Sequence, residues 1–107
     1  MGGPLPTGAV AEAGLSDWRL MDSKIRARFT AQSYTKAADL LSTIARAADD
    51  ADHHPDLDLR YPAEVLVTLT THSAGGVTQL DLDLAAVISA LAADAGAQAN
   101  VVYPTTP

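Results

Sequence analysis

Two segments near the start of the chain alternate between apolar and polar residues, as half-buried β-strands do. Residues 24–30 alternate most regularly, and residues 17–21 show a shorter alternation. The apolar face of the longer segment consists of Ile25, Ala27 and Phe29. Asp22 and Ser23 lie between the segments and suit a two-residue turn, so the pattern predicts a β-hairpin.

Two longer segments have the spacing of amphipathic helices. Over residues 34–51 apolar side chains recur at i, i+3, i+4 and i+7, and Ser33 can cap the helix. Its apolar stripe is Ala37, Leu40, Leu41, Ile44, Ala47, Ala48 and Ala51. The second helix begins at Thr78, which forms a capping-box pattern with Asp81, and Gly96 stops it. The stripe of that helix is Leu84, Val87, Ile88, Leu91 and Ala95.

A second pair of alternating segments lies between these helices. Residues 57–61 and 65–72 are predicted strands, and Pro62-Ala63-Glu64 is the turn that joins them. A short helix over residues 7–15, with Thr7 as its cap, is weakened by two glycines. The order is therefore α-β-β-α-β-β-α, which predicts an α+β fold with one antiparallel sheet. Residues 15–96 form the domain, residues 1–14 an arm or frayed helix, and residues 97–107 a tail.

The composition describes one globular domain. The chain has 107 residues, of which 48% are hydrophobic and 19% charged. Its net charge of −6 argues against non-specific binding of nucleic acid, which requires a basic surface. The absence of cysteine excludes disulfides, thiol catalysis and cysteine-ligated metals. No run approaches the roughly 18 apolar residues of a membrane span, and residues 1–6 lack the pattern of a secretory signal, so we expect a cytoplasmic protein.

All three histidines lie at the ends of predicted elements. His53 and His54 follow the first long helix, and His72 closes the last strand. Because imidazole titrates near neutrality, it can both donate and accept a proton. Three surface histidines without a shared role are the alternative, but element ends are where functional sites usually lie. The clustering favours an acid–base site.

The end of the first long helix is unusually acidic. Asp49, Asp50 and Asp52 crowd a helix C-terminus, where the helix dipole is already negative. Because Asp49 precedes His53 by four residues, one helical turn would bring them together, and a carboxylate within ~4–6 Å favours the imidazolium form. Such an imidazolium is a general acid. The alternatives are that these acids are only solvated and that Asp81 is only a helix cap.

A metal site is not expected from the three histidines. They could form a three-nitrogen zinc site, but neighbouring side chains such as His53 and His54 diverge. The usual His-Glu-x-x-His spacing is also absent. Ser-His-Asp, P-loop and dinucleotide-binding patterns are likewise missing, which leaves the histidines and acids as the candidate chemistry.

Together these residues form a long pattern that resembles the signature of the pterin-4a-carbinolamine dehydratases. The pattern is Asp49-x-x-x-His53-His54-Pro55, five residues, Tyr61, then Thr70-Thr71-His72-x-Ala74-Gly75-Gly76-x-Thr78-x-x-Asp81. The resemblance extends over about residues 15–93 and includes the Trp18 hairpin. It implies a four-stranded antiparallel sheet with helices on one face, and association into dimers through sheet edges and tetramers through helices. Unpaired sheet edges in so small a chain also favour a homo-oligomer.

The resemblance also implies an activity. Family members dehydrate 4a-hydroxytetrahydropterin to quinonoid dihydropterin without a metal or organic cofactor, which recycles tetrahydrobiopterin after an aromatic amino-acid hydroxylase has used it. Animal members are also dimerisation cofactors of a homeodomain transcription factor. A non-enzymatic assembly or regulatory module is therefore the alternative function, although the intact set of three histidines favours the enzyme.

The match to the family assigns residues to the site. His53, His54 and His72 correspond to the active-site histidines, and Asp81 to the supporting acid. The segments that line the pterin correspond to Asp52, His53, His54, Thr70, Thr71, His72 and Ser73. Loss of the 4a-hydroxyl needs a general acid, here His53 or His54, and His72 would hold or deprotonate the opposite side. One extra residue between Tyr61 and His72 departs from the usual pattern, and a turn at residues 62–64 can absorb it.

Overall fold

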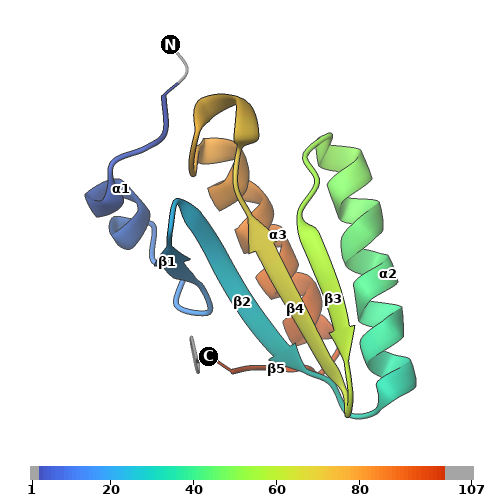
Figure 1. The fold of residues 1–107 in the computed structure, drawn as a ribbon. Helices are drawn as coiled ribbons and strands as arrows, with labels where there is room; N and C mark the ends of the chain where they lie inside the picture. The colour runs from blue at the N-terminus through green and yellow to red at the C-terminus, as the bar shows by residue number, and fades with distance from the viewer. Residues whose placement is uncertain (1–2, 101–107) are drawn as a thin grey trace.

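The computed structural model describes residues 3–100, which form one antiparallel sheet with two long helices on one face (Figure 1). The elements are α1 (Thr7–Glu12), β1 (Arg19–Met21), β2 (Lys24–Thr30), α2 (Tyr34–Ala51), β3 (Asp56–Arg60), β4 (Glu64–Leu69), the 3₁₀ turn η1 (His72–Ala74), α3 (Gln79–Asp94) and β5 (Gln98–Ala99). The predicted α+β class and antiparallel sheet are confirmed. None of the helices within residues 3–100 combines the length and apolar character needed to cross a bilayer.

The strand order is β1-β2-β4-β3, so the two predicted hairpins lie side by side through β2 and β4. Their register pairs Ile25 with Leu69 at one end and Thr30 with Glu64 at the other. The fifth strand, β5, pairs with β2 at Phe29 and Thr30. The predicted count of four strands is one short, because a two-residue strand is too brief to show an alternation.

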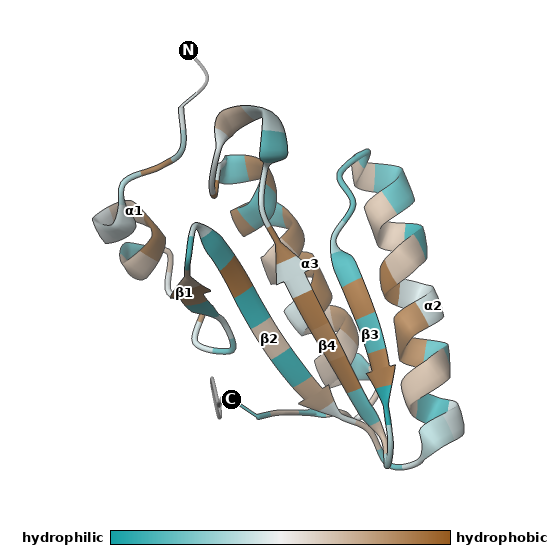
Figure 2. Cartoon of the chain, viewed as in Figure 1, coloured by the Kyte–Doolittle hydropathy of each residue, from teal (hydrophilic) through white to brown (hydrophobic). Residues whose placement is uncertain are grey.

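The core lies between the sheet and helices α2 and α3. Apolar side chains at alternate positions of β2 and β4 point toward the helices, and Figure 2 shows the resulting alternation along β2. The largest fully buried side chains of this core are Ile25, Phe29, Ile44, Val65, Val67, Leu69 and Ile88. Trp18 meets Phe29 edge to face, with 6.3 Å between ring centroids. Sheet and helices therefore share a single core.

The helix stripes were predicted correctly only in part. On α3 the buried apolar positions are Leu82, Leu84, Ala85, Ile88 and Ala92. Val87 is 46% exposed, and Ala95 is exposed as the C-cap of the helix. Ala51, at the end of α2, is exposed as well. The buried side of α3 differs from the predicted stripe because this helix is apolar on most of its circumference. Spacing alone therefore does not identify the side that meets the sheet.

Within residues 3–100 no helix packs on the sheet face away from α2 and α3, and this face is rich in cations. Strand alternation and cross-strand pairing place on it five of the chain's seven Lys and Arg residues: Arg19, Lys24, Arg26, Arg28 and Arg60. Arg28 Nε donates to Glu64 Oε1 at 2.6 Å, and Thr30 Oγ1 donates to the other carboxylate oxygen at 3.1 Å. Glu64 thereby joins β2 to β4 on this open face.

Several element boundaries differ from the predictions. Asp22 and Ser23 form the predicted turn with φ of 51° and 69°. Glu64, predicted to be in a turn, already pairs as the first residue of β4. The cap of α1 is Pro6 rather than Thr7, which lies inside the helix. Strand β4 ends at Leu69, so His72 begins η1 instead of closing the strand.

Candidate active site

One end of the sheet brings together segments that are far apart in the chain. Asp56, the first residue of β3, pairs with Thr68 near the end of β4. The residues just before β3 and just after β4 therefore lie at the same end of the sheet. His53 and His54 belong to the first group, and Thr71 and His72 to the second.

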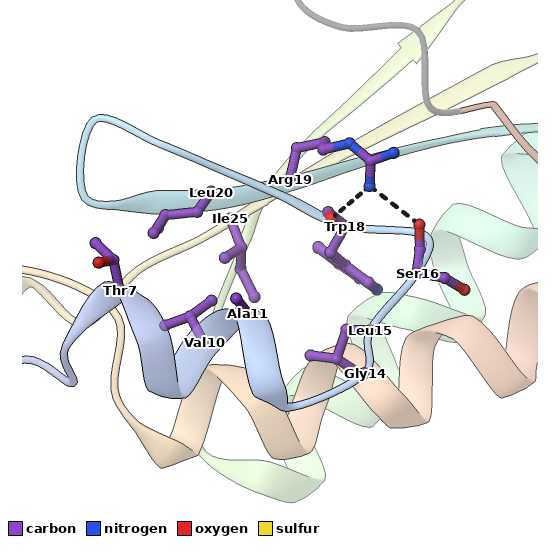
Figure 3. Close-up of a pocket in the computed structure, with 10 residues that line it drawn as sticks. All are labelled: Thr7, Val10, Ala11, Gly14, Leu15, Ser16, Trp18, Arg19, Leu20 and Ile25. Carbon is purple, nitrogen blue, oxygen red and sulfur yellow. Dashed lines mark hydrogen bonds between the residues drawn. The ribbon is translucent and has the colours of Figure 1, made fainter.

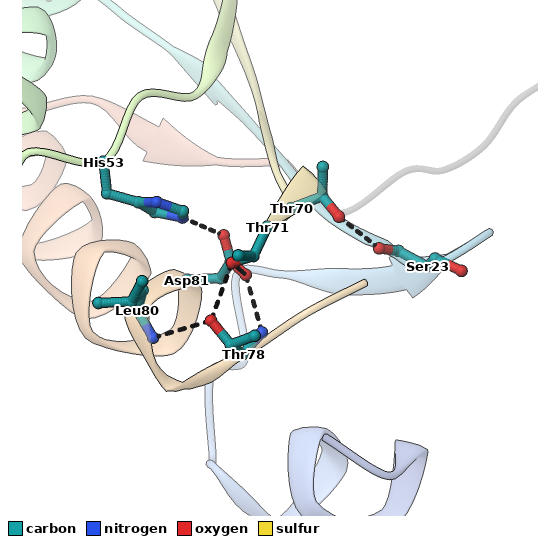
Figure 4. A network of polar contacts seen from close by, with 7 residues as sticks. All are labelled: Ser23, His53, Thr70, Thr71, Thr78, Leu80 and Asp81. Atoms are coloured by element: carbon teal, nitrogen blue, oxygen red, sulfur yellow. Dashed lines mark hydrogen bonds and ion pairs between the residues drawn. The ribbon is translucent and has the colours of Figure 1, made fainter. Parts of the chain in front are cut away.

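A fully buried carboxylate, Asp81, is the centre of a polar network (Figure 4). It occupies the third position of α3, where its Oδ2 accepts from the backbone N–H of Thr78 at 2.8 Å in a complete capping box. The same Oδ2 accepts from Thr71 Oγ1 at 2.7 Å. The hydroxyls of Thr71 and Thr78 also lie 2.8 Å apart. The network thus ties the start of α3 to the segment that follows β4.

The second oxygen of Asp81 lies against His53. The distance from Oδ1 to His53 Nε2 is 2.5 Å, and the histidine side chain is 12% exposed. The turn after α2 aims it there: Asp52 adopts the left-handed conformation with φ 52°, and the His53 N–H donates to the carbonyl of Ala48 at 3.1 Å. Residues 28 apart in sequence therefore form a nearly buried pair.

The pair with Asp81 determines which nitrogen of His53 can take part in chemistry. When Asp81 is ionised it only accepts hydrogen bonds, so Nε2 of His53 then carries a proton and Nδ1 remains to accept or donate another. An imidazole held in this way has a fixed ring orientation as well as a fixed tautomer. Such a group is suited to general acid or general base catalysis.

Asp49 contacts a different histidine from the one expected. Its Oδ1 lies 2.9 Å from Nε2 of His54, and both side chains are exposed, at 76% and 59%. Because Asp52 reverses the chain direction, His53 points toward α3 and leaves Asp49 beside His54. An exposed pair of this kind contributes little to stability.

The other predicted site residues occupy two kinds of position. The Thr71 side chain faces Asp81, and Thr70 Oγ1 donates to the carbonyl of Ser23 at 2.8 Å, so both hydroxyls are engaged within the protein. His72, Ser73 and Asp52 are exposed. His72 directly follows Thr71 and therefore lies one residue from the network. The sequence suggested Thr78 only as a cap; its hydroxyl contact with Thr71 depends on the loop between them.

A separate cavity of about 380 Å³ lies between α1 and the first hairpin, and its lining contains none of the histidines (Figure 3). Its walls are mainly apolar and include Val10, Leu15, Trp18, Leu20 and Ile25. At its rim the Arg19 guanidinium donates to the carbonyls of Ser16 and Trp18. Within residues 3–100 no three His, Asp or Glu side chains are grouped as metal ligands would be.

Comparison with known proteins finds a consistent set of relatives. A family model described as pterin 4 alpha carbinolamine dehydratase matches residues 5–91. A protein of Picosynechococcus sp. is 43% identical over 70% of this chain and 80% of its own length, and one of Nocardia farcinica is 44% identical over 78% and 87%. Both names give the pterin-4-alpha-carbinolamine dehydratase activity provisionally.

Two solved structures have a similar fold. The transcriptional coactivator/pterin dehydratase from Brucella melitensis is 32% identical, with a TM-score of 0.77 over 84% of this chain and 99% of that one. A pterin dehydratase-like protein described as a RuBisCO assembly factor of the alpha-carboxysome is 21% identical, with a TM-score of 0.57 over 70% and 86%. The second likeness concerns the fold alone.

Proposed function

We propose that this chain, which belongs to the pterin 4 alpha carbinolamine dehydratase family, is an active dehydratase of 4a-hydroxytetrahydropterin. The reaction breaks the C4a–O bond and releases water. A proton is delivered to the departing hydroxyl, and the N5 proton is removed as the C4a=N5 double bond forms. One general acid and one general base therefore suffice, and the reaction consumes no further reactant.

The histidines supply these two groups in the proposal. His53 or His54 protonates the leaving hydroxyl, and His72 holds the opposite side of the pterin or accepts the N5 proton. Asp81 orients His53 and balances its charge while it is an imidazolium. Asp52 and the segment Thr70–Ser73 lie beside the pterin, although the hydroxyls of Thr70 and Thr71 act as internal supports.

The contact between Asp81 and His53 carries the proposal. A capping box needs one carboxylate oxygen, and Oδ2 of Asp81 serves that purpose. Capping therefore does not explain why Oδ1 is fully buried at 2.5 Å from an imidazole. Burying a carboxylate is costly unless every lone pair finds a donor. The buried Oδ1 is explained if Asp81 orients His53, and an oriented imidazole is suited to acid–base catalysis.

The wider setting follows from the same proposal. The chain would act in the cytoplasm on the pterin left by an aromatic amino-acid hydroxylase, in tetrahydrobiopterin recycling, and it would need no metal or organic cofactor. It would work as a homodimer or homotetramer. The proposal involves neither a nucleic acid, which the net charge of −6 disfavours, nor a membrane.

A spectroscopic assay with synthetic 4a-hydroxytetrahydropterin tests the function directly. We expect the protein to accelerate the appearance of quinonoid dihydropterin above the rate in buffer. Asp81→Asn should remove most of this acceleration. The matched control is Asp83→Asn on the same helix, because Asp83 is exposed and, within residues 3–100, its side chain accepts a hydrogen bond only from Gln79. No acceleration by the parent protein would refute the proposal.

A binding module is the second candidate function. One similar structure, 32% identical, is described as a transcriptional coactivator as well as a pterin dehydratase. In this chain the cation-rich sheet face, on which no helix packs within residues 3–100, offers a surface for a protein partner. This candidate predicts a parent protein with no turnover, so that substitutions of the histidines change no rate.

A further inference from the structure

We propose that the N-terminal arm, Pro4-Leu5, positions the loop that carries His72. This inference rests on the dehydratase function proposed above. The loop comprises residues 71–77 and lies within the connection from β4 to α3, residues 70–78. In this role Pro4 and Leu5 are positioning residues, because they act on the histidine through the loop and not on the pterin.

The arm contacts the loop at adjacent residues, Gly76 and Val77. The N–H of Leu5 donates to the carbonyl of Val77 at 2.7 Å. Pro4 lies against Gly76, which is buried: a Cβ on Gly76 would be 2.8 Å from Pro4 Cβ, closer than side chains approach one another. The arm therefore packs against the loop at Gly76, where the loop has no side chain.

The two loop glycines are needed for different reasons. Gly75 has φ of +76°, a conformation that side chains rarely adopt, but a Cβ there would meet nothing within 4 Å. Gly76 does not have a positive φ, so the backbone conformation at this position would accept a side chain. Among residues 3–100, the close approach of Pro4 is what requires glycine at position 76. This difference provides a matched control within the same loop.

The contact at Gly76 continues to the acid–base network. Gly76 and Thr71 form a bridge across the loop, with the Thr71 N–H donating to the Gly76 carbonyl at 3.0 Å and the Gly76 N–H donating to the Thr71 carbonyl at 3.3 Å. His72 lies in the segment that this bridge closes. The Thr71 hydroxyl in turn donates to Asp81, the partner of His53. Gly76 and Thr71 thus link the arm to the buried carboxylate.

The arm contributes little to the core itself. None of the residues of α1, which follows it, is buried, and Pro4 is exposed. Leu5 is only partly buried at the edge of the core. Loosening the arm should therefore leave the fold intact while the loop moves. A displacement of about 1 Å at a catalytic group can cost on the order of 100-fold in rate.

The test is a double-mutant cycle that combines Gly76→Ala with Pro4→Gly, with Gly75→Ala as the control. We expect Gly76→Ala to lower kcat by roughly 10-fold or more, because the new methyl group displaces the arm and strains the bridge. Pro4→Gly in the same chain removes the clash, and kcat should return to within about threefold of the Pro4→Gly protein. The same second change should not rescue Gly75→Ala, because its defect lies in the backbone.

Amide hydrogen exchange separates this inference from the proposed function. The N–H groups of Thr71 and Gly76 should exchange about 10-fold faster in Gly76→Ala than in the parent and recover with Pro4→Gly. If the parent shows no turnover but exchange follows this pattern, the dehydratase proposal is wrong and the positioning contact stands. If Gly76→Ala leaves both kcat and exchange unchanged, or if Pro4→Gly rescues Gly75→Ala equally well, the positioning role is refuted.

Discussion

Replacing Asp81 tests the buried pair most directly, because this side chain joins the capping of α3 to the orientation of His53. Asp81→Asn preserves the shape of the carboxylate. One amide position can still accept from Thr71 and from the Thr78 N–H, as Oδ2 does now. The other position becomes an NH₂ group that faces His53 and can only donate. His53 must then accept at Nε2 and carry its proton on Nδ1.

The expected magnitudes follow from the hydrogen bonds that each substitution removes. In Asp81→Asn a charge-assisted hydrogen bond becomes a neutral one, which should lower the free energy of unfolding by about 1–2 kcal/mol. Asp81→Ala removes the carboxylate half of the capping box and leaves the donors of Thr71, Thr78 and His53 unpaired, so we expect a loss of about 3–5 kcal/mol. Either change should lower the dehydration rate by ~10²-fold or more, the usual worth of a positioned acid or base.

Three measurements check this prediction. Thermal unfolding followed by circular dichroism gives the change in stability, with Asp83→Asn as the control for loss of one carboxylate on α3. The ¹⁵N chemical shifts of the His53 ring show which nitrogen carries the proton. The dehydratase assay gives the rate. All three should change in Asp81→Asn and none in Asp83→Asn.

Two outcomes would contradict the reasoning. If Asp81→Asn keeps the proton of His53 on Nε2 and unfolds within about 0.5 kcal/mol of the parent, the pair does not determine the tautomer. If stability falls but turnover is unchanged, Asp81 is a helix cap and has no part in the chemistry.

Further predictions concern the exposed histidine, the open sheet face and the assembly. His72→Ala should lower the rate of dehydration by ~10²-fold or more. The free energy of unfolding should change by less than about 0.5 kcal/mol, because the side chain is exposed. A large loss of stability in urea denaturation would contradict this prediction. Glu64→Ala leaves Arg28 and Thr30 without their shared acceptor, so the free energy of unfolding in urea should fall by about 1–3 kcal/mol. An unchanged urea midpoint would contradict this contribution of the contact to stability. Light scattering at micromolar concentration should give a mass above 11.1 kDa, and a monomeric mass would remove the predicted homo-oligomer.

Features with a local physical cause could be predicted from the sequence. The alternation over residues 24–30 and the helical spacing over residues 34–51 each depend on side chains close together in the chain, and both elements are found there. The capping box of Thr78 and Asp81 spans only three residues and is also present. The position of all three histidines near the ends of elements could also be predicted without tertiary information. That prediction depends only on where the strands and helices end.

The partners of those histidines were decided by the tertiary structure. Sequence spacing placed Asp49 beside His53, but the left-handed turn at Asp52 directs His53 to Asp81, 28 residues away, and leaves Asp49 on His54. Contacts between residues so far apart depend on strand register and on how the helices pack against the sheet. Neither can be predicted from the local spacing of apolar residues. For the same reason only the folded chain shows that the arm rests on the loop of His72, where a missing side chain at Gly76 makes room for Pro4.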